Sequence, residues 1–390
     1  MDMTNCTLQE LLAEFNRIAD NPAERANAWK EKTGGKVVGI GGLDIPEPLI
    51  HAAGMLPVVL LGNKDEVTLA NAHIEMHQCG YIRSLVDQAL KGELQFCDEL
   101  LFHDCCHIVR MLVDAMHTFT DAKPGVVIPK AKFVYFSPKL ESPSGQKYTG
   151  NEMAALRTRL EEMSGNKITD EALKASIALF NKAKKLLLKL YDMRCSHPGL
   201  IGGWDTTQVV AAGMVMPRED YVEMLERLIA LLEPEMAKPA SKKTPVVVHG
   251  SLCERCDKTV LDEIEAAGGV IVYDDLYVGS KYFNTLYDES IAPMDALLKA
   301  YVKRISPCPT RYEERDPGDY LTQLVKDSKA AGIIMVVVKF CEAHDYLYFT
   351  ARRRFEQQGI PEMLVETEHE GMAEGQLKTR LQGFFEKLDA

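Results

Sequence analysis

The sequence predicts an α/β protein with two Rossmann-like parallel-sheet domains, an N-terminal helix and a central helical segment. Short runs of β-branched residues recur in both halves of the chain, and each is followed by a stretch with helical spacing. The 390 residues are enough for two or three domains. Strands that alternate with helices imply parallel sheets covered by helices on both faces.

The first 35 residues predict a helical entry segment. Apolar residues recur there at three- and four-residue spacing, and Gly34 and Gly35 then end the pattern. The recurring apolar residues are Leu8, Leu11, Leu12, Phe15 and Ile18.

Residues 36–150 predict the first Rossmann-like domain. Its expected strands occupy residues 37–40, 57–61, 99–104 and 125–137. Residues 151–240 lack strand signals and carry Leu and Ile at helical spacing among charges, as in ALFNKAKKLLLKLYDM, so they predict a helical segment. The short polar stretch at 239–243 is the best boundary candidate before the next β-run.

Residues 241–390 predict a second Rossmann-like domain. Its expected strands are PVVVHGS, GGVIVYDD, GIIMVVVKFC and IPEMLVETE, with helices between them and a last helix after them. No sequence repeat of about 20–50 residues is visible, so any likeness between the two halves lies in architecture and not in sequence.

Composition and charge exclude several classes of protein. Lys and Arg total 45 against 57 for Asp and Glu, and this net charge of −12 disfavours binding to nucleic acid. No apolar run reaches the roughly 18 residues of a membrane span. The N-terminus, MDMTNCTLQELLAEF, lacks the basic start and apolar core of a signal peptide, which predicts a cytoplasmic protein.

Nucleotide binding by this chain is not expected. The sequence has no G-x-x-x-x-G-K-[ST] loop, and GIGG at residues 39–42 lacks the spacing of a dinucleotide fingerprint. If ATP matters for the function, we expect another protein to hydrolyse it.

Ten cysteines are more than packing explains in a reducing compartment. Cys105 and Cys106 follow one predicted strand, Cys341 follows another, and Cys79 precedes a helix. Ligands bind outside the carboxyl ends of parallel strands, so three such thiols could converge and hold an iron–sulfur cluster or a catalytic zinc. The alternative is that they are buried apolar thiols.

Three other motifs have ordinary alternatives. Cys253 and Cys256 form a lone C-x-x-C before a helix, a position that lowers a thiol pKa and permits a redox role, but two plain loop thiols are the simpler interpretation. His103 and His107 have zinc-like spacing, yet one is predicted on a strand and the other on a helix. Glu47 lies between prolines at a predicted helix start, where a structural role is simpler than that of a general base.

Several segments, in order along the chain, resemble the catalytic subunits of 2-hydroxyacyl-CoA dehydratases and ATP-dependent benzoyl-CoA reductases. The similarity runs from about residue 8 to the C-terminus. The segments are IPEPLIHAAGMLPVVLLG, QCGYIRSLVDQAL, FCDELLFHDCCHIVRML, GGVIVYDDLYVGSKYF, VVVKFCEAHDYLYF and MLVETEHEGMAEGQLKTRLQGFFE.

The resemblance implies a cofactor. Each family subunit holds one [4Fe-4S] cluster through three cysteines, which correspond here to Cys79, Cys106 and Cys341. Cys106 is preferred to Cys105 because an apolar helix follows it as in the family, although His107 stands where the family usually has Asp. Thiolate ligation and burial allow a protein to tune such a cluster to low potential.

The resemblance also implies partners and a reaction class. An ATP-hydrolysing iron–sulfur activator protein would inject an electron, an acyl-CoA thioester would be the substrate, and a homologous second subunit, or a second copy, would complete an enzyme of anaerobic metabolism. The length resembles the smaller subunit of either pair. The segment from DDLYVGSKYF to SPCPTR favours benzoyl-CoA reductase-type reduction over radical elimination of water from an (R)-2-hydroxyacyl-CoA.

Two further interpretations stay open. A double-cubane branch of the family needs more ligands, but Tyr277 stands where one of its extra cysteines falls, and Cys97 and Cys308 leave the set incomplete. The chain could also be a non-catalytic electron-relay subunit whose cluster serves a homologous chain.

Overall fold

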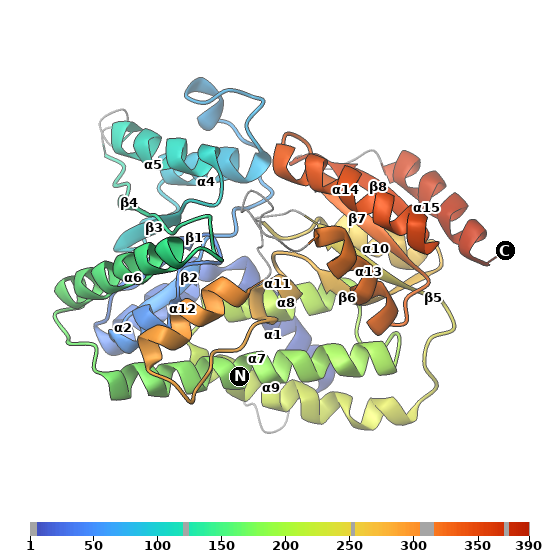
Figure 1. The fold of residues 1–390 in the computed structure, drawn as a ribbon, viewed down its shortest axis with the longest axis horizontal. Helices are drawn as coiled ribbons and strands as arrows, with labels where there is room; N and C mark the ends of the chain where they lie inside the picture. The colour runs from blue at the N-terminus through green and yellow to red at the C-terminus, as the bar shows by residue number, and fades with distance from the viewer. Residues whose placement is uncertain (1–5, 120–124, 251–253, 305–315, 370–373, 390) are drawn as a thin grey trace.

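The computed structural model describes residues 6–119, 125–250, 254–304, 316–369 and 374–389. These residues form two four-stranded parallel sheets, as the sequence predicted (Figure 1). The strands of the first sheet are β1 (Val37–Gly41), β2 (Leu56–Val59), β3 (Glu99–His103) and β4 (Lys130–Val134). Those of the second are β5 (Thr244–Gly250), β6 (Gly269–Asp275), β7 (Gly332–Val338) and β8 (Glu362–Thr367).

The two sheets have the same topology. Their strand orders are β2-β1-β3-β4 and β6-β5-β7-β8, so the first strand of each half lies between the second and the third. The halves therefore share architecture although no repeat is visible in the sequence. In each sheet the direction of winding reverses between the first and third strands, and open parallel sheets bind ligands outside the carboxyl ends at this point.

Alternating side chains divide the first sheet between two apolar layers. Leu100 and Phe102 face the layer formed with α1, α4 and α5, while Leu101 faces the layer formed with α3, α6 and α12. These helices are α1 (Leu8–Asp20), α3 (Glu47–Ala52), α4 (Gly80–Lys91), α5 (His107–Phe119), α6 (Pro143–Ser164) and α12 (Pro293–Lys303). The helix α12 was not predicted, and although it follows β6 in the chain, it packs on the first sheet.

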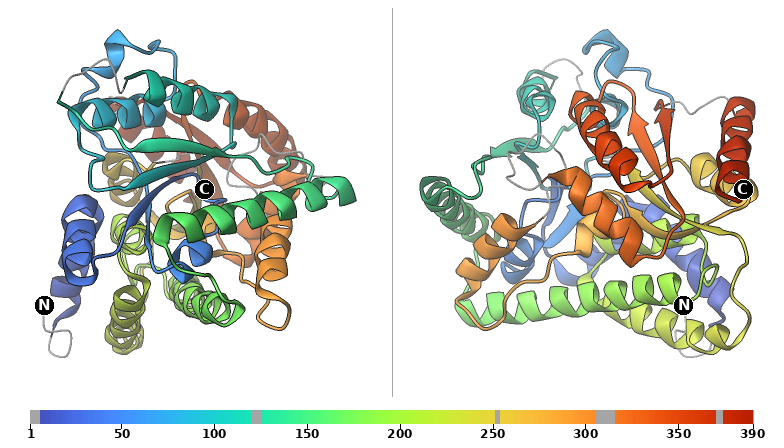
Figure 2. Two further views of the ribbon diagram at one scale, coloured as in Figure 1. Left: turned by 90° about the vertical axis from the view of Figure 1, so that its left-hand side faces the viewer. Right: turned by 45° about the vertical axis from the view of Figure 1, so that its right-hand side comes forward.

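The second sheet is covered in the same way. Helices α10 and α15 cover one face of this sheet, and α13 and α14 cover the other (Figure 2). Ile334 and Val336 pack with the first pair, whereas Ile333 and Met335 pack with the second. These helices are α10 (Lys258–Ala266), α13 (Pro317–Asp327), α14 (Glu342–Gln358) and α15 (Glu374–Asp389). A one-turn helix, α11 (Ser280–Phe283), follows β6.

The central helices join the two halves. They are α7 (Asp170–Ser196), α8 (Gly203–Val215) and α9 (Arg218–Leu232), with short turns η1 (Ala70–Ala72) and η2 (Pro234–Ala237) elsewhere. In Figure 1, α7 runs beneath both sheets, and α9 lies below α7. The buried pair of Arg194 on α7 and Asp274 on β6, at 2.6 Å, fastens this layer to the second sheet.

Besides α12, two elements differ from the predictions. The entry segment is not one helix, because α1 ends at Asp20 and α2 (Pro22–Thr33) begins directly after Asn21. Pro22 has no N–H and occupies the first position of α2, which stops the first helix. The strand expected over 125–137 is only Lys130–Val134. No helix in the described ranges is long and apolar enough to cross a membrane.

Candidate functional site

The structure places the candidate cysteines at equivalent points of the two halves. Cys105 and Cys106 lie between β3 and α5, and Cys341 lies between β7 and α14. Both strands are the third of their sheet and neighbour its first strand. Both cysteine segments therefore lie at the carboxyl edge, beside the position where winding reverses.

All three predicted ligands lie at helix N-termini. Cys79 is the N-cap residue of α4 and Cys341 that of α14, while Cys106 directly precedes α5. The positive end of a helix dipole stabilises a thiolate. At Cys106 this effect is opposed, because a hydrogen bond with Cys105 and burial raise its pKa above the ordinary thiol value, despite hydrogen bonds from the N–H groups of Ile108 and Val109.

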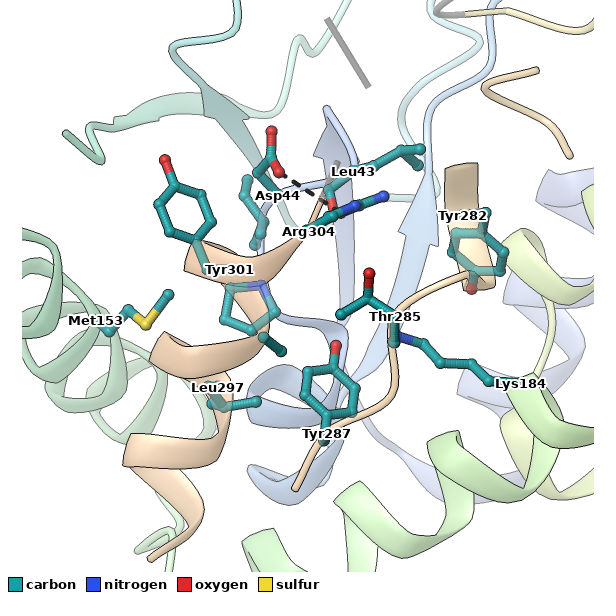
Figure 3. A pocket seen from close by; sticks show the side chains of 13 residues that line it. Leu43, Asp44, Met153, Lys184, Tyr282, Thr285, Tyr287, Leu297, Tyr301 and Arg304 are labelled. Carbon is teal, nitrogen blue, oxygen red and sulfur yellow. Dashed lines mark hydrogen bonds and ion pairs between the residues drawn. The ribbon is translucent and has the colours of Figure 1, made fainter. Parts of the chain in front are cut away.

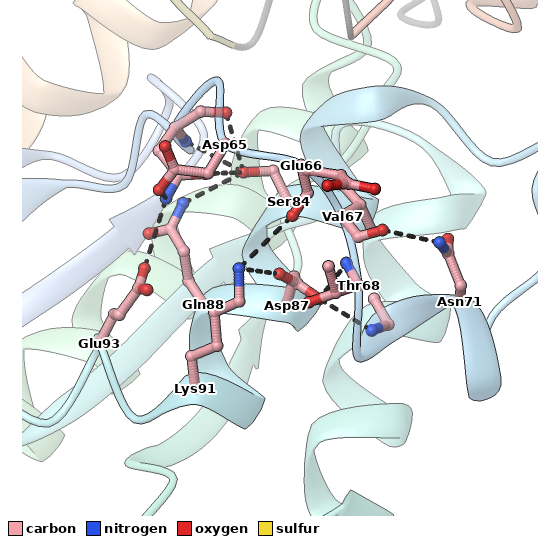
Figure 4. Close-up of polar contacts among 12 residues, drawn as sticks. Asp65, Glu66, Val67, Thr68, Asn71, Ser84, Asp87, Gln88, Lys91 and Glu93 are labelled. Atoms are coloured by element: carbon pink, nitrogen blue, oxygen red, sulfur yellow. Dashed lines mark hydrogen bonds and ion pairs between the residues drawn. The ribbon is translucent and has the colours of Figure 1, made fainter.

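A polar network anchors the loop that leads to Cys79 (Figure 4). The Asp87 carboxylate on α4 accepts hydrogen bonds from the backbone N–H groups of Thr68, at 3.0 Å, and Ala70, at 2.9 Å. Lys91 lies 2.6 Å from its other oxygen. Burial favours the neutral carboxyl, but the hydrogen bond from Lys91 and the two N–H groups outweigh it and lower the pKa of Asp87.

Replacing Asp87 by alanine is expected to lower the free energy of unfolding by about 1–3 kcal/mol, because two N–H groups lose their acceptor. Urea unfolding measures the loss, and faster hydrogen exchange at Thr68 and Ala70 locates it. Asp87→Asn keeps one acceptor oxygen and should lose less. Equal stability of Asp87→Ala and the wild type would contradict this role for Asp87.

The start of α4 contacts the carboxyl edge of the second sheet. A Cβ on Gly80 would collide with the Cβ of His369, which follows β8, so only glycine allows this approach. Lys64 donates to Glu254 at 2.8 Å, and the His369 ring lies 3.5 Å from the same carboxylate. The segment around Cys79 is thus fixed between the two halves.

The three thiols do not form a closed ligand set in this structure. No group of three His, Cys, Asp or Glu side chains among the described residues is close enough to hold a metal ion. Their chemistry nevertheless fits a cluster ligand set: Cys79, Cys106 and Cys341 are partly exposed thiols at helix starts.

Other cysteines do not fit such a site. Cys97 precedes β3, at the opposite edge of the sheet, and burial raises the pKa of its thiol. It is therefore excluded as an extra ligand. The pKa of Cys256 is also raised by burial, to about 12, so the helix start does not activate this thiol, in line with the simpler interpretation of a plain loop thiol. Cys253 and Cys308 lie outside the described residues.

The contacts of His103 and Glu47 fit structural roles, as expected from the sequence. His103 is buried on β3, with its ring against Phe136 and Tyr301. Glu47 begins α3, and its carboxylate accepts hydrogen bonds from Arg218 at 2.9 Å and from the Tyr282 hydroxyl at 3.0 Å. The backbone places residue 107 at the start of α5.

A buried histidine pair at the edge of the second sheet was missed by sequence reasoning. His249 Nδ1 lies 2.8 Å from Asp275, and His344 Nδ1 lies 3.3 Å from the sulfur of Cys341. The Nε2 atoms of both rings are buried without a hydrogen-bond partner. The only available signal was that a His ends PVVVHG, an Asp ends VIVYDD, and a His follows Cys341 by three residues.

These surroundings lower the pKa values of both His249 and its partner Asp275. Burial and the charge of Lys281 lower the pKa of His249 to about 4. Burial opposes ionisation of Asp275, but Lys281 and His249 outweigh it and lower that pKa to about 2. His249 is therefore neutral and Asp275 ionised near neutral pH.

The neutral state of His249 predicts loss of stability in mild acid. Between the ordinary histidine pKa of 6.5 and about 4, the unfolded chain binds a proton at His249 and the folded chain does not. The free energy of unfolding should fall by about 2–3 kcal/mol as the pH decreases through this interval. His249→Gln cannot titrate, so urea unfolding over a pH series should show a flatter profile. An identical slope in both proteins would refute the assignment.

A small cavity lies at the carboxyl edge of the first sheet (Figure 3). The loop after β1 forms one wall, with Leu43 and Asp44, and Arg304 at the end of α12 lies beside it. Lys184 on α7 and Tyr287 line the opposite side. Asp44 lies 3.4 Å from His103, so the cavity is close to the Cys105–Cys106 segment.

Comparison with known proteins identifies the family. The family described as 2-hydroxyglutaryl-CoA dehydratase, D-component, matches residues 43–388. The chain belongs to this family of enzymes. The match covers β2, β3 and β4 of the first sheet, the whole second sheet and all three cysteine segments. It agrees with the resemblance inferred from the sequence.

Similar proteins of this dehydratase family are subunits of larger enzymes. The chain is 28% identical to the (R)-phenyllactyl-CoA dehydratase beta subunit of Clostridium sporogenes, over 96% of this chain and 98% of that protein. It is 23% identical to the beta subunit of (R)-2-hydroxyglutaryl-CoA dehydratase from Acidaminococcus fermentans, over 98% and 100%. It is 30% identical to a benzoyl-CoA reductase subunit of Thauera aromatica, over 81% and 82%.

Proposed function

We propose that this chain is the iron–sulfur subunit of an ATP-activated enzyme that processes acyl-CoA thioesters. The observation that carries the proposal is the placement of three partly exposed thiols, Cys79, Cys106 and Cys341, at helix starts on the carboxyl edges of the two sheets, in a chain that matches the family over residues 43–388. These residues would hold one [4Fe-4S] cluster. Such a cluster supplies one-electron transfer at low potential.

The chain's own residues would prepare the site. The helix dipoles favour thiolate over thiol, and the Asp87 network holds the Cys79 loop in place. If Cys341 binds the cluster as a thiolate, the ring of His344 is placed to donate a hydrogen bond to its sulfur. Hydrogen bonds to cluster sulfurs tune the potential.

Two reactions are candidates, each favoured by a different relative. The 30% identity to a benzoyl-CoA reductase subunit favours reduction of an aromatic acyl-CoA. The nearly full-length matches to dehydratase beta subunits favour elimination of water from an (R)-2-hydroxyacyl-CoA. In either case a homologous second subunit and an ATP-hydrolysing iron–sulfur activator would complete the enzyme.

Reconstituted turnover tests this proposal. The chain is purified without oxygen together with the homologous subunit encoded in its own genome, and it is supplied with activator, reductant and either benzoyl-CoA or (R)-phenyllactyl-CoA. ATP-dependent turnover of one substrate class assigns the reaction. Turnover that persists without ATP and activator would contradict the proposal. Turnover by this chain and the activator alone would exclude a pure relay role.

A further inference from the structure

The cavity beside β1 contains a cation that no acid in the described ranges balances. Lys184 Nζ donates to the backbone carbonyl of Thr285 at 2.7 Å and lies 4.2 Å from the centre of the Tyr287 ring. No carboxylate in the part of the chain described here lies at ion-pair distance from it. Lys184 is half-buried, and even partial burial of an amine without a counter-ion is costly.

The neighbouring charges are already engaged. Arg218 is paired with Glu47 at 2.9 Å. Arg304 lies 3.5 Å from Asp44 and donates to the carbonyl oxygens of Leu43 and Lys281. The acids near the cavity thus have cationic partners of their own, and the charge of Lys184 remains in excess.

Hydrogen bonds from α7 hold the part of the cavity wall that contains Tyr287. Asn181, one turn before Lys184 on α7, is buried and donates to the Tyr287 carbonyl at 2.9 Å. Its side-chain oxygen accepts from the Tyr287 N–H at 2.9 Å. These two hydrogen bonds fix Tyr287 beside Lys184, and such a pre-formed wall lowers the cost of ordering a ligand.

The structure assigns this cavity as a binding site for a carboxylate, with Lys184 as its principal partner and Tyr287 and Arg304 at its walls (Figure 3). The cavity is small, so it takes a carboxylate group and not a whole CoA thioester. Its place at the carboxyl edge of the first sheet, next to the segment that carries Cys105 and Cys106, is where an open parallel sheet binds ligands.

The carboxylate that binds in this cavity has two candidate sources. The carboxylate is either the far end of an acyl group bound as a CoA thioester, or a free small carboxylate. The first source rests on the proposed function, whereas binding of a carboxylate as such does not.

NMR of isotope-labelled lysine side chains in the full-length chain provides the test. Burial and the charge of Arg304 lower the pKa of Lys184 to about 7, so its signal should titrate apart from those of the exposed lysines. A bound carboxylate favours the charged amine and should raise this pKa by about one unit or more. Lys184→Met assigns the signal, and Lys182→Met, an exposed lysine of the same helix paired with Glu226, is the matched control.

The probes separate the two sources. Glutaryl-CoA is compared with butyryl-CoA, and free glutarate with free acetate. A shift caused by glutaryl-CoA and absent with butyryl-CoA supports an acyl carboxylate; a shift caused by glutarate or acetate supports a free one. Lys184→Met should lower the affinity for the probe that shifts the signal by about tenfold or more, and Lys182→Met should leave this affinity unchanged.

Two results would overturn the assignment: no probe shifts the Lys184 signal, or butyryl-CoA shifts it as much as glutaryl-CoA while the free carboxylates have no effect. Iron content, measured on the same samples, keeps this test separate from that of the cofactor. A preparation that holds iron but binds no carboxylate refutes the carboxylate site alone. One that binds carboxylate but never holds iron refutes the proposed cofactor alone.

Discussion

Replacing Cys79, Cys106 or Cys341 by serine is expected to abolish iron binding. A cluster held by three protein thiolates loses a third of its protein ligands in each variant, and a serine hydroxyl is mostly protonated near neutral pH and is a poor ligand for iron. Iron and sulfide determination after anaerobic purification measures the loss. All three variants should fall close to zero, because a partly ligated cubane cluster is lost rather than retained at partial occupancy.

Two matched variants make this experiment specific. Cys195→Ser alters another partly exposed thiol, which lies on α7 and donates to the carbonyl of Val272, and it should retain its iron. Cys105→Ser distinguishes the adjacent thiols of the β3 segment, and we expect iron to be retained because Cys106 is the assigned ligand. Iron retained in any of the three serine variants at the assigned positions would remove that position from the ligand set.

Replacing Asp274 by alanine is expected to lower the free energy of unfolding by about 3–5 kcal/mol, because Arg194 would remain buried without its counter-ion. Both side chains are about 2% exposed or less. Arg194 donates to Asp274 at 2.6 Å and to the Ile271 carbonyl at 2.9 Å, and the Tyr191 hydroxyl donates to Asp274 at 2.5 Å. The pair joins α7 to the second sheet, so its loss should loosen the connection between the halves.

Urea unfolding followed by far-ultraviolet circular dichroism measures this effect. Asp192→Ala removes an exposed acid from the same helix and should change stability by less than about 0.5 kcal/mol. Combining Asp274→Leu with Arg194→Met removes both charges and should recover part of the loss. A loss below about 1 kcal/mol for Asp274→Ala would show that the ion pair does not stabilise the fold.

The strands could be predicted because the sequence of a buried parallel strand is a continuous run of β-branched and other apolar residues. VVGI and GIIMVVV both became central strands with buried residues throughout. Local signals failed where geometry depends on distant partners. The run over 125–137 is strand only where it pairs with β3, and α12 was missed because its apolar face is defined by a sheet far away in the sequence.

The candidate site was predictable only in part, for the same reason. The sequence shows directly that cysteines follow the predicted strands, and parallel topology places the ends of these strands at the same edge of the sheet. Contacts such as His249 with Asp275, or Glu47 with Arg218 across 171 positions, leave no local pattern. The cavity around Lys184 combines the β1 loop, α7 and α12, which no spacing rule connects.

The most direct test of the proposed cofactor is iron and sulfide determination, with EPR, on the wild-type chain purified without oxygen. We predict about four irons and four sulfides per chain, and an EPR signal of a reduced cluster after treatment with a low-potential reductant. One tightly bound zinc, or no iron after anaerobic reconstitution, would contradict the cluster and return Cys79, Cys106 and Cys341 to the role of structural thiols.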